Sequence, residues 1–90
     1  MNTQYFIYAI EVEKTGSITQ AANNLFMSQP TLSKAIRDME SSVGFPVFKR
    51  TSKGVVPTQR GTEFLIYAKK IAAQLQKMDA ILHAQDTSHQ

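Results

Sequence analysis

The sequence predicts a mainly α-helical domain with three short helices, a two-stranded β hairpin and a long fourth helix. Apolar residues recur at helical spacing in four segments, and serine or threonine caps precede three of them. Two short β-prone runs stand between the third and fourth helical segments. Ninety residues are enough for one small domain with a modest core of its own.

The first two helices are expected on either side of Gly16. The segment 2–15 places aromatic and aliphatic residues between polar ones, so its aromatics are expected to enter the core. Gly16 can adopt the left-handed conformation that ends a helix, and Ser17 with Gln20 forms a capping box for the next one. The second helix carries a single apolar stripe: Ile18, Ala21, Ala22 and Leu25.

The third helix is predicted over residues 28–43. Ser28 caps it, and Pro30 stands in the first turn, where its missing N–H costs nothing. Its buried side is predicted to hold Leu32, Ala35, Ile36, Met39 and Val43. The opposite, outer side holds Pro30, Ser33, Lys34, Arg37 and Ser41, and Gln29 and Thr31 flank that side near the N-terminal end.

A hairpin and a long helix complete the chain. Gly44 and Pro46 end the third helix, and the runs 47–50 and 55–57 read as two strands with cations on one strand and at the tip. Thr58 is the predicted cap of a helix over 59–84, and 85–90 is a polar tail expected to be frayed. Apolar residues at heptad spacing form a line along one face of this helix, which we call the seam: Phe64, Ala68, Ile71, Leu75, Met78 and Leu82.

The seam predicts a partner helix. Its start, Phe64 to Ala68, is expected to pack on the domain itself. Beyond Ile71 the helix outruns the core of so small a domain, because about 25 residues of helix span on the order of 37 Å. We therefore expect a dimer interface along the seam.

Positive charge is concentrated in the middle third of the chain. Residues 28–60 hold six cations and two anions, a local balance of +4, whereas the rest of the chain has a balance of −1. Other classes of site find no support. There is no cysteine, and His83 and His89 lie near the C-terminus with no acidic cluster at ligand spacing, so no metal, cofactor or catalytic residue is expected. No apolar run is long enough to cross a bilayer, which predicts a protein of the cytoplasm.

Two helices joined by a tight connection, the second with a basic outer face, are typical of a helix-turn-helix, and the following hairpin makes it winged. Cations neutralise phosphates, and side chains with paired donors and acceptors read base edges in the major groove. Gln29 can bind adenine, Lys34 and Arg37 guanine or phosphate, and Ser33 either. Ser17 and Gln20 join these candidates because free N–H groups at a helix start can hold phosphate oxygens.

The stretches "GSITQAANNLFMSQPTLSKAIRDMESSVGFPVFKR", residues 16–50, and "PTQRG", residues 57–61, resemble the LysR-type transcriptional regulators in their N-terminal DNA-binding region. The resemblance covers about 6–82. It implies a winged helix-turn-helix domain over 1–58, and a linker helix over 59–84 that pairs two subunits antiparallel on an imperfect palindrome of double-stranded DNA. It further implies a bacterial, nucleoid-associated protein. The full-length protein can, by the same resemblance, form a tetramer.

The resemblance also assigns roles to residues, and the sequence departs from the family pattern in several places, of which the largest is its length. Family residues matching Gln29, Pro30, Thr31, Ser33 and Lys34 face the major groove, and the wing-tip cation, here Lys53, approaches the minor groove. Ala9 stands where the family has a large aromatic residue. The small-molecule effector of the family binds a C-terminal domain that is absent from these residues, so the chain is either a fragment or a truncated relative.

Alternative interpretations remain at several residues. Lys34 and Arg37 can form a merely solvated face, and a winged helix can bind proteins instead of DNA. Glu40 lies beside the buried stripe and is expected to pair internally with a cation such as Arg50, which can alternatively pair with Glu63. An enzyme is the remotest interpretation, because neither histidine has a plausible catalytic partner.

Overall fold

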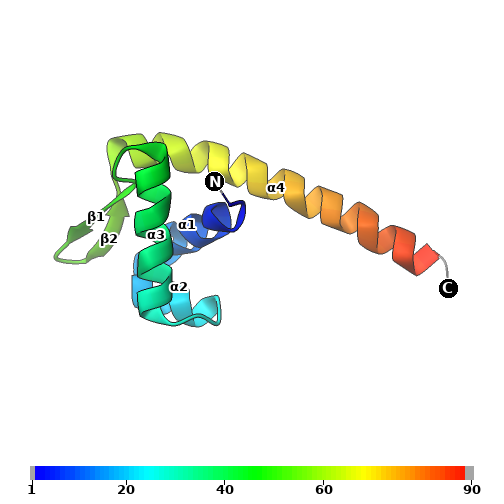
Figure 1. Cartoon of the computed structure of the whole chain (residues 1–90), viewed down its shortest axis with the longest axis horizontal. Helices are drawn as coiled ribbons and strands as arrows, with labels where there is room; N and C mark the ends of the chain where they lie inside the picture. The colour runs from blue at the N-terminus through cyan, green and yellow to red at the C-terminus, as the bar shows by residue number, and fades with distance from the viewer. Residues whose placement is uncertain (1, 89–90) are drawn as a thin grey trace.

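The computed structural model describes residues 2–88 and contains the predicted elements in the predicted order. They are α1 (Gln4–Thr15), α2 (Ile18–Asn24), α3 (Gln29–Val43), β1 (Phe48–Thr51), β2 (Gly54–Pro57) and α4 (Gln59–Ser88). The strands pair antiparallel, with Arg50 opposite Val55 and Lys49 opposite Val56. In Figure 1 the hairpin projects on one side of α3 and the far half of α4 on the other. The molecule therefore has the architecture of a winged helix-turn-helix with a long additional helix.

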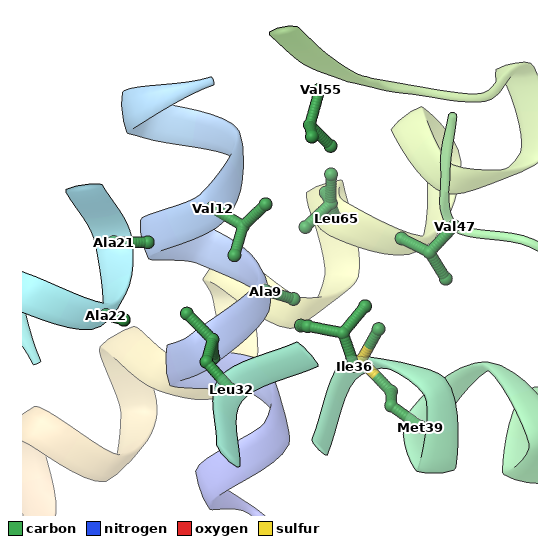
Figure 2. Close-up of a cluster of buried hydrophobic side chains, with 10 residues drawn as sticks. All are labelled: Ala9, Val12, Ala21, Ala22, Leu32, Ile36, Met39, Val47, Val55 and Leu65. Atoms are coloured by element: carbon green, nitrogen blue, oxygen red, sulfur yellow. The ribbon is translucent and has the colours of Figure 1, made fainter. Parts of the chain in front are cut away.

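The core lies where α1 meets the other three helices and β2. Side chains from all four helices and the hairpin converge there (Figure 2), and Leu32, Met39 and Leu65 are its largest fully buried members. Each such side chain stabilises the fold by about 1.5–3 kcal/mol relative to an exposed one. Because α3 contributes three of the buried residues, Leu32, Ile36 and Met39, the direction of its outer face is fixed by the core.

The aromatics of α1 differ from the prediction. The fully buried residues of α1 are Ala9 and Val12, whereas Tyr5 and Phe6 are only half-buried. Phe6 packs on Phe64 of α4, with ring centroids 6.1 Å apart. The small Ala9 lets the neighbouring helices come close, so the aromatics cover the edge of the core and do not fill its centre.

The ends of α1, α2 and α4 refine the sequence prediction. Gly16 ends α1 with a φ of 68°, as expected. The Ser17 Oγ accepts a hydrogen bond from the Gln20 N–H at 3.1 Å, but the second half of the capping box is absent because the Ser17 N–H donates to the Thr15 Oγ1 at 3.3 Å. Helix α4 begins at Gln59 as predicted and runs to Ser88, so residues 85–88, expected to fray, are helical, and 89–90 lie outside the described residues.

Backbone hydrogen bonds fix the hairpin to the helical core. The Val55 N–H donates to the Gly16 carbonyl at 2.9 Å, which ties β2 to the turn between α1 and α2. At the other end, the Thr58 N–H donates to the Val47 carbonyl at 2.9 Å, and the Thr58 Oγ1 accepts from the Gly61 N–H at 2.9 Å as the cap of α4. The wing is therefore held in one orientation beside α3.

Glu40 is internal, as predicted, but its partner is not a cation. Its Oε2 accepts hydrogen bonds from the backbone N–H groups of Val47 at 2.7 Å and Phe48 at 3.1 Å. The expected ion pair with Arg50 is therefore wrong. The reason is geometric: the last turns of α3 lie against the chain that enters β1, where two N–H groups need an acceptor.

Candidate nucleic-acid interface

The outer face of α3 brings together most of the residues predicted to read DNA. Ser28 caps the helix by accepting from the Thr31 N–H at 3.2 Å, and its own hydroxyl donates to the Thr31 Oγ1 at 2.7 Å. Pro30 follows in the first turn and is exposed. A helix with this cap presents its first turn in a fixed direction.

Two neighbouring side chains on this face are already hydrogen-bonded to each other. The Gln29 Nε2 donates to the Ser33 Oγ at 2.7 Å, and both side chains are half-buried. This contact leaves the Gln29 amide with one N–H and its oxygen available. A donor and an acceptor held side by side are the pair that matches the major-groove edge of adenine.

The cations of α3 extend this surface toward its middle. Lys34 and Arg37 are both exposed, and the Lys34 Nζ lies 2.9 Å from the Asp38 Oδ2. The hydrogen bond to Asp38, and then the charge of that carboxylate, raise the pKa of Lys34 above its ordinary value. Asp38 was missed by the sequence reasoning, although the i,i+4 spacing from Lys34 is itself the signal of such a pair.

A cleft of about 210 Å³ separates α3 from the wing. Arg50 lines it from β1 together with Arg37 and Ser33 from α3. Arg50 stands opposite the buried Val55, on the strand face turned toward the core, yet it is exposed at the mouth of the cleft. Lys53 lies exposed in the turn between the strands. The wing therefore adds positive charge beside the outer face of α3.

Ser17 and Gln20 lie apart from that face, at the start of α2. The Ser17 Oγ is occupied by its capping bond, and the Gln20 Nε2 donates to the Asn24 Oδ1 at 2.9 Å. Asn24 in turn donates to the Glu11 Oε2 at 2.8 Å. The structure thus places Gln20 in a network of surface side chains that the sequence did not indicate.

The seam divides at Ile71 into two parts. Ala68 is buried and Phe64 half-buried against the domain, whereas Ile71, Met78 and Leu82 are exposed by 40%, 58% and 52%. Leu75 is half-buried in an open groove of about 370 Å³ between the start of α1 and α4. The sequence missed Leu65, which is 1% exposed and packs in the core one position away from the seam.

The fold and this face define a winged helix-turn-helix domain. The model of the bacterial regulatory helix-turn-helix proteins of the lysR family matches residues 4–62, and the chain belongs to that family. A RuBisCO operon transcriptional regulator of Allochromatium vinosum is 36% identical over 73 residues, which are 81% of this chain and 24% of that protein. The regulator BudR of Klebsiella aerogenes is 40% identical over 73 residues, 81% of this chain and 51% of that protein.

Solved structures agree with this assignment. A crystal structure of the BenM DNA-binding domain with catB site 1 DNA has a TM-score of 0.88 and 29% identity, covering 100% of this chain and 97% of that one. The CbnR DNA-binding domain in its DNA complex has a TM-score of 0.84 and 26% identity, covering 94% and 98%. The chain spans about a quarter of the length of the first of these regulators and about half of the second. Family membership places it among regulatory proteins and not among enzymes.

No helix within the described residues is long and apolar enough to cross a membrane. The same residues contain no group of three or more histidine, cysteine or acidic side chains arranged to hold a metal ion.

Proposed function

We propose that the chain binds double-stranded DNA in a sequence-specific manner, as the DNA-binding domain of a LysR-type transcriptional regulator in the bacterial cytoplasm. The observation that supports this most directly is the outer face of α3, where Gln29, Ser33, Lys34 and Arg37 lie together on a helix held by the core. An α-helix of this kind fits the major groove. The DNA complexes of the BenM and CbnR domains, which share this fold, support the same proposal.

The residues divide into readers and clamps in this proposal. Gln29, Pro30, Thr31, Ser33 and Lys34 face base edges, with the Gln29 amide oriented for adenine. Arg37 holds phosphate, and Lys53 approaches the minor groove from the wing tip. Ser17 and Gln20, at the start of α2, contact the phosphate backbone of the DNA.

We further propose a homodimer that pairs through α4 and presents two copies of α3 to an imperfect palindrome. Support comes from the exposed second half of the seam and from the apolar groove around Leu75. Exposed apolar surface of this extent along one helix is typical of a protein interface. A tetramer of the full-length protein and a small-molecule effector that acts through a further domain are part of the same proposal.

Selection of bound sequences from a random duplex pool, followed by titration under rising salt, tests the function. We expect an enriched site with two-fold symmetry and a steep fall of affinity with salt, because several phosphate contacts release counterions. Enrichment of no sequence, with a flat salt response, would contradict DNA binding and favour a protein-binding role for the same face.

A further inference from the structure

One carboxylate stands on the otherwise neutral or cationic outer face of α3. Asp38 follows Lys34 by one helical turn, and the Lys34 Nζ and Asp38 Oδ2 lie 2.9 Å apart. The two side chains are exposed by 72% and 47%. Their neighbour Arg37 is exposed as well. An anion in this place has to be accounted for, because it repels the phosphates of any duplex that approaches the face.

Stability of the fold does not account for this carboxylate. An exposed lysine–aspartate pair one turn apart contributes little to the stability of a helix, because water screens its charges. The contact instead changes what Lys34 can do. A lysine amine has three donors on a flexible four-carbon stem. Asp38 takes one of these donors and holds the amine near the helix, which leaves two donors available to another partner.

We propose that Asp38 is a positioning residue for Lys34 that increases the discrimination between the cognate site and other DNA. This inference rests on the proposed function. On a cognate site Lys34 donates to base acceptors and keeps its bond to Asp38. On other sequences Lys34 has to swing away to a phosphate, which leaves an unpaired carboxylate close to the DNA backbone. The unpaired carboxylate therefore weakens only the complexes with other sequences. Because specificity is a difference between affinities, the discrimination in favour of the cognate site increases.

The Asp38→Asn variant tests this proposal on the full 90-residue chain. The probes are the duplex selected from the random pool and a scrambled duplex of the same composition. We expect the affinity for the scrambled duplex to rise about two- to fivefold, the size of an exposed ion-pair coupling, with the cognate affinity unchanged within about twofold. The slope of log affinity against log salt on the scrambled duplex should steepen by about one.

The chain offers a matched control for the change in net charge. Glu13 of α1 pairs with Lys69 of α4 at 2.8 Å, and neither residue belongs to α3. Glu13→Gln removes the same charge from the molecule as Asp38→Asn, and it should raise both affinities alike by a small factor. Asp38→Glu keeps a carboxylate at the i,i+4 position and should restore discrimination to the wild-type value.

A background without the lysine separates positioning from simple repulsion. In Lys34→Ala, adding Asp38→Asn should leave the cognate-to-scrambled ratio unchanged, because no amine remains to be positioned. If Asp38→Asn shifts both duplexes equally, as Glu13→Gln does, or if it lowers the ratio just as much without Lys34, the inference is overturned while DNA binding stands. If the wild-type chain selects no duplex, the proposed function fails first and the inference fails with it.

Discussion

At the scale of single residues, the contact between Gln29 and Ser33 carries the most specific expectation. The Ser33 hydroxyl fixes one N–H of the Gln29 amide, so the other N–H and the oxygen are held as a pair. Such a pair distinguishes adenine from the other bases in the major groove.

Gln29→Ala should therefore weaken binding to the selected duplex by about 1–3 kcal/mol and binding to a scrambled duplex much less. The measurement is a titration of both duplexes at one salt concentration. Gln74→Ala, at an exposed position of α4, is the control and should change neither affinity. Equal losses on both duplexes would assign Gln29 to the phosphate backbone.

Glu40 shows how far residue types alone can lead. Its place beside the buried stripe indicated an internal role, but the sequence offered cations as partners and the structure supplies two backbone N–H groups. Nothing in the order of residues states which main-chain groups a side chain will meet, because that depends on how α3 packs against the chain before β1.

Glu40→Ala should lower the free energy of unfolding by about 1–3 kcal/mol, because the N–H groups of Val47 and Phe48 lose their acceptor. Urea unfolding followed by circular dichroism measures this. Glu40→Gln keeps one acceptor oxygen and should lose less. Ser41→Ala, at an exposed position next in the helix, is expected to be neutral. A loss from Ser41→Ala as large as that from Glu40→Ala would refute the role given to the carboxylate.

At the scale of elements, caps and periodicity were predictable, and close contacts between elements were not. Ser17, Ser28 and Thr58 all cap as expected, since a cap is a local event. The sequence did not predict that Leu65 is buried in the core. The first turns of α4 carry apolar residues on more than one face, and only the packed structure shows which of these faces meets the core.

Of the four glycines, Gly61 is the one approached most closely by another part of the backbone. A Cβ at this position would lie 2.0 Å from the Val47 carbonyl oxygen, which also accepts the Thr58 N–H. Gly61→Ala should therefore push α4 away from the chain that enters β1 and destabilise the fold by about 1–3 kcal/mol. Thermal unfolding measures the loss. Thr62→Ala, at the exposed next position, is the comparison, and equal melting temperatures for Gly61→Ala and wild type would show that the contact relaxes at no cost.

At the scale of the whole molecule, the exposed half of α4 is the surface through which we propose that the dimer forms. Leu75→Glu places a charge in the groove between α1 and α4 and should convert the proposed dimer into a monomer. Sedimentation equilibrium gives the mass directly. Gln74→Glu introduces the same charge next to the groove and should leave the mass unchanged. A dimer that survives Leu75→Glu would place the interface elsewhere.

The length of α4, 30 residues, has a further consequence for the spacing of the two DNA-binding domains in the proposed dimer. At 1.5 Å per residue it is about 45 Å long. If α4 tilts by about 5° about its far end, α3 moves by about 4 Å. This is close to the ~3.4 Å step from one base to the next. In a dimer joined along α4, the straightness of this helix determines which bases lie opposite α3 of the second subunit. A proline introduced near the middle of α4 would therefore change the preferred separation of the half-sites.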